Sequence, residues 1–274
     1  MLLEYKIGEG QEAEVYTCGE HTVLKLFRDA SYAEKAHAEF ERMKAVHAQG
    51  LPSPAVYECT TVNGRPGYSM EYIEGRSLLS SLLDNVLSAR KIAVRFASIQ
   101  AQIHTATVPG SLKPEKESLE WCIMHAGLSG TECAYGLQLL KAAPEGSSLC
   151  HGDYNLTNVI INKKNEPVVI DWGAAACGFY ISDVANAVLM IKNGAVRGRI
   201  NPAVRLVLAL FRKNLAGMYL KAYRHLHTFS DKELHDWEVI RSMARLAYCS
   251  EAEKPALLKF IHTCFAKPEK VLLF

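Results

Sequence analysis

The segment from His151 to Trp172 constrains the fold of this 274-residue chain more than any other. It reads HGDYNLTNVIINKKNEPVVIDW, so that Asp153 precedes Asn158 by five residues and Asp171 follows Asn158 by thirteen. The apolar run Val-Val-Ile directly before Asp171 is typical of a short buried strand. The segment therefore predicts a loop that carries one carboxylate and one amide, then a strand whose end presents a second carboxylate.

These three side chains fit phosphoryl transfer to a hydroxyl group. A carboxylate within hydrogen-bond reach can orient an attacking hydroxyl and take its proton, and we expect Asp153 in this role. Mg²⁺ prefers oxygen ligands, which the side-chain carbonyl of Asn158 and the carboxylate of Asp171 supply. Each residue alone would also suit a turn, a helix cap or a strand end, so the interpretation depends on all the spacings together.

The segment resembles the catalytic loop of the aminoglycoside phosphotransferase and choline kinase family, with its pattern H-G-D-x-x-x-x-N, an apolar strand and I-D-[WF]. The resemblance implies an α+β, protein-kinase-like bilobed fold, with a small antiparallel-sheet lobe containing one main helix and a larger, mainly helical lobe. Residues 1–75 would form the nucleotide-binding lobe, with a hinge near 71–75, and residues 76–274 the lobe with the catalytic loop and acceptor site. The implied reaction is transfer of the γ-phosphate of ATP or GTP, with Mg²⁺, to a hydroxyl of a small molecule.

The resemblance also bears on two residues around the loop. A histidine at the position of His151 packs beneath the loop in this family, and no cysteine or histidine at metal-ligand spacing accompanies it here. We therefore expect a structural role for His151 rather than that of a base or zinc ligand. Asp183 matches a downstream aspartate that holds the loop from a following helix. An N-cap is the alternative, with Ser182 or Asp183 opening the apolar helix Val184–Ile191.

The amino-terminal residues supply candidates for nucleotide binding. Residues Gly8 to Val15 fit G-x-G-x-x-G-x-V, with Gly8 and Gly10 as the first two glycines and alanine in place of the third. Glycines allow the backbone to approach phosphates and tolerate positive φ, although Gly-x-Gly between strands is also a plain hairpin turn. Lys25 lies in the run Thr22–Phe27, which predicts a strand. A lysine in a strand is commonly just solvated, but behind this loop and ahead of the segment from His151 we expect Lys25 to pair with the α- and β-phosphates.

The lysine of such a site needs an acidic partner on the next helix. The pattern predicts this helix from Ser31, its expected cap, to Ala48. Glu39 has the register in which the family carries the glutamate that pairs with the lysine. Glu34 and Glu41 are the competing residues on the same helix.

A hairpin and the connection after it complete the predicted nucleotide site. Strands at Val56–Val62 and Gly67–Tyr72 flank Asn63-Gly64, which is a strong hairpin signal. The second strand runs into a segment that resembles the hinge between kinase lobes. The resemblance implies that the carbonyl of Glu71 and the N–H of Ile73 face the nucleobase.

Charge and composition limit the partners. Net charge changes from −5 in residues 1–75 to +7 in residues 172–274, within a total of +2. The basic final segment argues against polycationic aminoglycosides as acceptors, and no dense basic cluster with interleaved aromatics indicates nucleic-acid binding. Eight cysteines without C-x-x-C pairs, no apolar stretch of membrane-spanning length and no signal-peptide core predict a cytoplasmic protein with no membrane partner. No obligate protein partner is evident.

Two alternatives to an aminoglycoside kinase stay open. One is a kinase for another acceptor, such as choline, a sugar or homoserine, and the other is a catalytically idle nucleotide sensor. The three tryptophans, Trp121, Trp172 and Trp237, are expected to be packing residues. The apolar end Val271–Phe274 is a candidate to dock near the acceptor site with its carboxylate.

Overall fold

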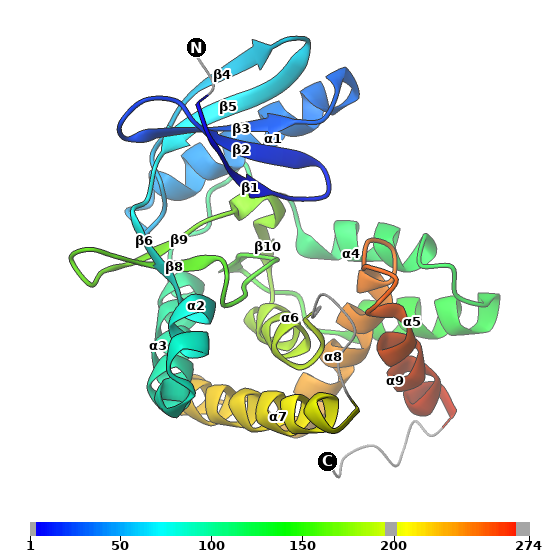
Figure 1. The fold of residues 1–274 in the computed structure, drawn as a ribbon. Coiled ribbons are helices and arrows are strands. Elements are labelled where there is room, and N and C mark those ends of the chain that lie inside the picture. Colours follow the sequence, from blue (N-terminus) through cyan, green and yellow to red (C-terminus); the bar gives the residue numbers. More distant parts are fainter. Residues whose placement is uncertain (1–3, 195–201, 267–274) are drawn as a thin grey trace. The chain divides into compact units, whose positions relative to one another are not determined.

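The computed structural model describes residues 4–194 and 202–266 of the chain. These residues form two compact units, and unit 1 contains the described residues within 1–81, 109–112 and 157–175. Unit 2 contains those within 82–108, 113–156 and 176–274. Figure 1 shows the element labels used below. No helix in the described ranges is both long enough and apolar enough to cross a lipid bilayer.

Unit 1 is built on a five-stranded antiparallel sheet in the order β1-β2-β3-β5-β4. The strands are β1 (Lys6–Glu9), β2 (Ala13–Thr17), β3 (Thr22–Phe27), β4 (Val56–Val62) and β5 (Arg65–Glu71). The expected strand around Lys25 is confirmed, and so is the hairpin at Asn63 and Gly64, which have φ of 51° and 76°. Two successive residues with positive φ give the turn whose twist matches that of the flanking strands.

One helix packs against this sheet. α1 (Ala33–His47) follows the short 3-10 helix η1 (Ala30–Tyr32) and contacts β4 and β5. The expected cap at Ser31 is wrong, because Tyr32 precedes α1 and Ser31 lies within η1. Asp29 caps η1 instead, by accepting a hydrogen bond from the backbone N–H of Ser31 at 2.9 Å. An aspartate two residues earlier thus starts the helical segment.

A second, smaller sheet in unit 1 contains the two strands that lie between the candidate metal ligands, Asn158 and Asp171, in the sequence. It has the order β6-β8-β9, with β6 (Gly75–Ser77), β8 (Val159–Asn162) and β9 (Pro167–Val169), and the 3-10 helix η3 (Trp172–Ala174) follows. Both strand pairs are antiparallel. The carbonyl of Ile161 leaves no room for a Cβ at Gly75, since that atom would lie 2.3 Å from the oxygen.

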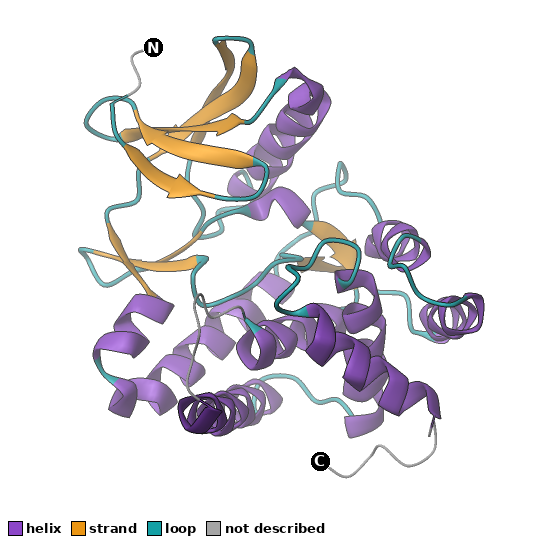
Figure 2. Cartoon of the chain, turned by 45° about the vertical axis from the view of Figure 1, so that its right-hand side comes forward, coloured by secondary structure: helices purple, strands orange, loops and turns teal. Residues whose placement is uncertain are grey.

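Unit 2 consists mainly of helices, which Figure 2 shows in purple. They are η2 (Val86–Ser88), α3 (Ala89–His104), α4 (Glu115–Met124), α5 (Gly130–Ala142), α6 (Tyr180–Asn193), α7 (Pro202–Arg224), α8 (Asp231–Arg245) and α9 (Lys254–Ala266). The helix α2 (Leu78–Asp84) lies at the boundary between the units in the sequence. A two-stranded sheet joins β7 (Ser148–Cys150) to β10 (Ala176–Gly178). Sheet and helices together confirm the α+β class.

Helix α6 is the centre of unit 2. It contacts α7 and α8, and nearly all its residues from Ile181 to Ile191 are buried. A helix that is apolar on every side belongs in a core, so the polar residues within it need partners inside the protein. Two of these polar residues, Asp183 and Asn186, hold the loop that carries Asp153, whereas Ser182 accepts from Arg241 on α8.

Candidate active site

Lys25 lies within a group of ionisable side chains in unit 1. Its Nζ is 2.5 Å from Oε1 of Glu39 and 2.9 Å from Oδ1 of Asp171. The Tyr68 hydroxyl donates to the same Oε1 of Glu39 at 2.7 Å. Lys25 and Tyr68 are opposite one another on β3 and β5, so the sheet register brings both side chains to this oxygen. Segments far apart in the sequence thus meet around one ammonium group.

Glu39 is the only one of the three candidate glutamates on the buried face of α1. Glu34 and Glu41 are exposed, whereas Glu39 shares its face with the buried residues Ala36 and Met43. Gly173 in η3 makes room for it, because a Cβ at Gly173 would lie 2.8 Å from the carboxylate carbon of Glu39. The helix face and this glycine therefore select which glutamate reaches the lysine.

The neighbouring carboxylates keep Lys25 charged. Burial disfavours the ammonium form, but Asp171 and Glu39 outweigh it and hold the pKa of Lys25 above its usual value. Burial, followed by the charge of Glu39, raises the pKa of Tyr68, so its hydroxyl remains a donor. The side chain of Lys25 is 17% exposed. A fixed, partly accessible cation of this kind can bind an anion such as a phosphate group.

Asp171 has an unusual backbone conformation. Its φ of 65° and ψ of 57° lie in the left-handed region, which aspartate tolerates better than most residues. Trp172 is fully buried, and its indole N–H donates to the carbonyl of Val169 at 2.8 Å, which fixes the turn. The Asp171 side chain is 45% exposed. Strained residues of this kind are concentrated at functional sites because the surrounding structure must hold them.

Asn158 and Asp171 lie at the same end of the β8–β9 pair. Asn158 directly precedes β8, and Asp171 comes two residues after β9, which runs antiparallel to it. The N–H of Ile170 donates to the backbone carbonyl of Asn158 at 2.9 Å. The strand pairing therefore fixes the distance between the two backbones that carry the predicted metal ligands.

The donor set at this end of the β8–β9 pair fits Mg²⁺. A side-chain carbonyl oxygen and a carboxylate are the hard oxygen ligands that this ion prefers. In the described ranges no cluster of three or more His, Cys, Asp or Glu side chains could hold a metal by itself. Protein sites for Mg²⁺ commonly use one or two carboxylates and leave the remaining positions to phosphate oxygens and water. Asn158 and Asp171 suit a metal that arrives with a nucleotide.

The loop that carries Asp153 belongs to unit 2 and follows β7. Gly152 has a φ of 80°, which favours glycine at this position. The backbone N–H groups of His151 and Gly152 donate to the Asp183 carboxylate at 3.1 and 2.8 Å. The N–H of Asp153 donates to Nδ1 of His151 at 3.2 Å, and His151 is fully buried. The imidazole thus lies under the loop and supports its backbone, as the resemblance implies.

Asp183 holds the loop from inside α6, so the alternative interpretation as an N-cap is wrong. The helix begins at Tyr180, and neither Ser182 nor Asp183 precedes it. Burial opposes ionisation of Asp183, but the hydrogen bond from His104 and the positive charges nearby hold its pKa below the usual value. Asn186, one turn further on, donates to the carbonyl of Gly152 at 2.8 Å. Asp183 therefore binds two N–H donors of the loop, and Asn186 binds one of its carbonyl acceptors.

Sequence reasoning missed several residues around this loop. The side-chain amide of Asn155 donates to the backbone carbonyl of Asp153 at 3.1 Å and lies 3.4 Å from its Oδ2. Tyr154 is fully buried and donates to the carbonyl of Phe96 on α3 at 2.8 Å. Asn186 could have been found from its spacing, since it follows Asp183 by three residues within an apolar helix. Nothing local to Asn155 or Tyr154 indicates their partners.

The glycine-containing loop of unit 1 differs in detail from the expectation. Neither Gly8 nor Gly10 has positive φ, and a Cβ at either would make only ordinary contacts within the chain. Arg28 holds the turn by donating to the carbonyls of Gly10 and Gln11 at 2.8 and 2.7 Å. The chain itself therefore gives no steric reason for these two glycines. At the other predicted nucleotide contact, Glu71 ends β5 and Ile73 lies in the connection to β6.

The expectation that all three tryptophans are packing residues holds for only two of them. Trp172 and Trp237 are buried packing residues, but the same expectation for Trp121 is wrong, since it is 56% exposed and stacks on His125. The segment Val271–Phe274 lies outside the described residues.

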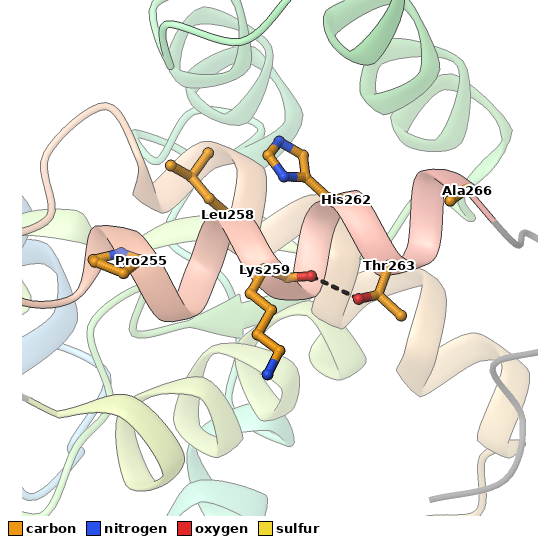
Figure 3. A pocket seen from close by; sticks show the side chains of 6 residues that line it. All are labelled: Pro255, Leu258, Lys259, His262, Thr263 and Ala266. Atoms are coloured by element: carbon orange, nitrogen blue, oxygen red, sulfur yellow. Dashed lines mark hydrogen bonds between the residues drawn. The ribbon is translucent and has the colours of Figure 1, made fainter.

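A surface hollow of about 620 Å³ runs along α9 (Figure 3), and none of the motif residues lines it. It is lined by Pro255, Leu258, Lys259, His262, Thr263 and Ala266. All six come from one helix, and we assign the hollow no role.

Comparison with known proteins identifies the family. The model of the phosphotransferase enzyme family matches residues 6–226, and the chain belongs to this family. Among curated proteins, human acyl-CoA dehydrogenase family member 11 is 25% identical over 212 residues, which cover 68% of this chain and 27% of the human protein. The chain thus spans about a quarter of the length of the curated relatives it matches.

Solved structures with the same fold include kinases for different small molecules. Aminoglycoside-3'-phosphotransferase of type VIII has a TM-score of 0.64 and 16% identity, over 89% of this chain and 92% of that one. Choline kinase LicA from Streptococcus pneumoniae has a TM-score of 0.64 and 14% identity, over 96% and 94%. The amicoumacin kinase hAmiN, solved with AMP-PNP, Ca²⁺ and Ami, has a TM-score of 0.61 and 14% identity, over 96% and 88%. These likenesses confirm the protein-kinase-like fold.

Proposed function

We propose that this protein is a small-molecule kinase that transfers the γ-phosphate of ATP or GTP to a hydroxyl group. The observation that carries the proposal is the meeting of Lys25, Glu39 and Asp171 in unit 1. A lysine held between a helix glutamate and an aspartate after an apolar strand is the arrangement that phosphoryl transfer of the protein-kinase type requires. Family membership and a solved neighbour that contains AMP-PNP support it.

Nucleotide binding is assigned to residues 1–75. Lys25 binds the α- and β-phosphates, and Glu39 directs its ammonium group. Gly8 and Gly10 cover the phosphates, and the lack of any steric need for glycine within the chain agrees with close approach of a ligand there. The carbonyl of Glu71 and the N–H of Ile73 bind the nucleobase edge.

Asn158 and Asp171 would hold Mg²⁺. When bound, the ion neutralises negative charge on the phosphate groups. Lys25 contacts Asp171 directly, so its ammonium group occupies part of the carboxylate that the metal would share. Glu39 offers Lys25 a second anionic partner and thereby limits this competition.

Asp153 is assigned to the acceptor hydroxyl, which it orients and deprotonates as the new bond forms. Its backbone is fixed by His151 and, through the preceding residues, by Asp183. Asn155 holds one end of the side chain through Oδ2. The helical remainder of the chain, residues 76–274, supplies the acceptor site.

One observation favours an acceptor other than a polycationic antibiotic. Residues 172–274 have a net charge of +7, and Arg245 at the end of α8 belongs to this segment. Burial opposes its charge, but hydrogen bonding to Glu253 and the nearby carboxylates of Glu253 and Asp153 hold the pKa of Arg245 above its usual value. Arg245 is paired with Glu253 at 2.8 Å, so it is the net positive charge of the segment that favours a neutral or anionic acceptor, such as a sugar or a hydroxy acid like homoserine.

An idle nucleotide sensor is the remaining alternative, and one assay separates it from a kinase. We would measure γ-phosphate transfer from ATP and from GTP, with Mg²⁺, to aminoglycosides, choline, sugars and hydroxy amino acids. Asp153→Asn is the matched blank, because it keeps the size of the side chain but removes the base. Product from the wild type that is at least 100-fold lower in the blank, on the order expected for a general base, supports the kinase.

Equal rates for wild type and blank would refute the role of Asp153. Magnesium-dependent nucleotide binding without transfer to any acceptor would favour the sensor. Absence of nucleotide binding would refute the proposal built on Lys25 and Asp171.

A further inference from the structure

A chain of buried hydrogen bonds links α7 to the loop of Asp153 in unit 2. We call it the tyrosine relay and define it by Tyr219 and Tyr223 on α7, Gln100 and His104 on α3, and Asp183 on α6. Helices α3 and α7 pack against each other, as Figures 1 and 2 show. All five side chains are buried, and four of them have an exposed fraction of 0%. Buried polar groups at such density require a complete set of partners.

Both branches of the tyrosine relay lead from a tyrosine hydroxyl to the same carboxylate oxygen of Asp183. The Tyr219 hydroxyl donates to Oε1 of Gln100, whose Nε2 donates to Oδ2 of Asp183 at 3.1 Å. The Tyr223 hydroxyl is 2.5 Å from Nδ1 of His104, and His104 Nε2 is 3.1 Å from the same Oδ2. Because an ionised carboxylate only accepts, Nε2 of His104 donates to Oδ2 of Asp183, and Nδ1 of the same ring contacts the Tyr223 hydroxyl. Burial raises the pKa of both tyrosines, which keeps their hydroxyl groups protonated.

The relay ends at the catalytic loop. Asp183 accepts hydrogen bonds from Gln100 and His104 on one side and from the N–H groups of His151 and Gly152 on the other. Oδ2 of Asp183 is thus bound by two side chains whose other polar atoms contact the tyrosines, and Oδ1 of the same carboxylate accepts from the N–H of Gly152. A rotation of Asp183 would change the position of the backbone that leads directly into the next residue, Asp153.

We propose that Tyr223 and Tyr219 are positioning residues for phosphoryl transfer, acting on Asp153 through His104, Gln100 and Asp183. The proposal rests on the kinase function proposed above. Packing alone does not require these hydroxyl groups, because phenylalanine would fill nearly the same volume without a polar atom to satisfy. Fully satisfied buried networks instead rigidify one arrangement of the groups they contain. The relay makes α7, which contributes none of the motif residues, part of the catalytic apparatus.

The chain offers a matched control. Tyr180 stacks on Tyr223, with ring centroids 6.4 Å apart, but its hydroxyl donates to the backbone carbonyl of Thr228 at 2.9 Å and not to the relay. Tyr223→Phe and Tyr180→Phe therefore remove the same atom from neighbouring rings. Tyr219→Phe is a second test variant, which breaks the Gln100 branch alone. Circular dichroism establishes that each variant is folded.

Two readouts test the proposal. We expect Tyr223→Phe and Tyr219→Phe to lower kcat about tenfold, because small misplacement of a catalytic group costs rate, while KM for the nucleotide stays within about twofold. Tyr180→Phe should leave both constants within about twofold of the wild type. Amide hydrogen exchange at Gly152 should be at least about tenfold faster in the two relay variants than in Tyr180→Phe.

The outcomes separate the relay from the kinase function. Equal kcat values and equal Gly152 exchange in Tyr223→Phe and Tyr180→Phe would overturn the proposal. Equal losses of kcat in the two variants would also overturn it, since that would indicate a general effect of the ring cluster. If no acceptor is phosphorylated even by the wild type, faster Gly152 exchange in the relay variants alone still supports positioning of the loop, and the failure belongs to the proposed function.

Discussion

Replacing Glu39 by glutamine tests the central ion pair of unit 1. The amide keeps the size of the side chain and an oxygen that can still accept from Lys25 and from Tyr68, so mainly the charge is lost. Removing one partner of a buried ion pair typically costs about 3–5 kcal/mol. Lys25 retains Asp171 at 2.9 Å, but that carboxylate is 45% exposed and solvent weakens its contribution. We therefore expect Glu39→Gln to lower the free energy of unfolding by about 2 kcal/mol.

The same variant should change catalysis through Asp171. Without the charge of Glu39, the lysine has one anionic partner left, and its ammonium group should shift toward the carboxylate assigned to the metal. The Mg²⁺ concentration for half-maximal rate should rise, and kcat should fall at least about tenfold, as for other lost phosphate-positioning contacts. Nucleotide affinity should weaken as well, because the lysine is turned away from the phosphates.

Urea unfolding followed by tryptophan fluorescence measures the stability change, since Trp172 is the tryptophan of unit 1 and is fully buried. Glu34→Gln and Glu41→Gln are the controls, because both remove a charge from the exposed side of the same helix. Each should change stability by less than about 0.5 kcal/mol. A loss in Glu39→Gln no larger than in these controls, with an unchanged Mg²⁺ requirement, would refute the reasoning.

Two further perturbations have clear expected outcomes. Gly173→Ala should lower the free energy of unfolding by about 1–3 kcal/mol and weaken nucleotide binding, because the added Cβ displaces the Glu39 carboxylate; wild-type values in urea unfolding and nucleotide titration would contradict this. A hydrogen bond from Arg65 is the largest of the causes that lower the pKa of Glu14 from 4.5 to about 2. The stability this provides is present above pH 4.5 and is lost as the pH falls toward 2, so Glu14→Gln should flatten acid unfolding in that window, whereas Glu20→Gln should not.

Much of the fold follows from local signals in the sequence. Alternation at Thr22–Phe27 and the Asn63-Gly64 turn predict the strand and the hairpin because their physical causes act over a few residues. The resemblance of the loop from His151 predicts the fold class, which the solved neighbours confirm. Helix starts were predicted less well, since Asp29 rather than Ser31 begins the segment before α1 and Asp183 lies inside α6.

Glu39 illustrates how much of the candidate site can be inferred from the sequence. Its position between Ala36 and Met43 marks it as the acidic residue on the buried face of the helix, which the 3.6-residue period alone could have indicated. The helical period cannot indicate which residues contact Glu39. Lys25, Tyr68 and Asp171 reach Glu39 through sheet register and through the close approach of Gly173, which depend on contacts between distant segments.

The sequence by itself determined the family, the fold class and the residue types for the proposed phosphoryl transfer, because these depend on spacings within short segments. The tertiary structure decided which groups fix those residues in place. Asn155 and the tyrosine relay carry no local signal of their roles, since a hydrogen bond between residues 119 apart, such as that between Tyr223 and His104, exists only after the helices pack. The set of partners in that relay, and with it the arrangement of the Asp183 carboxylate, is a property of the folded core alone.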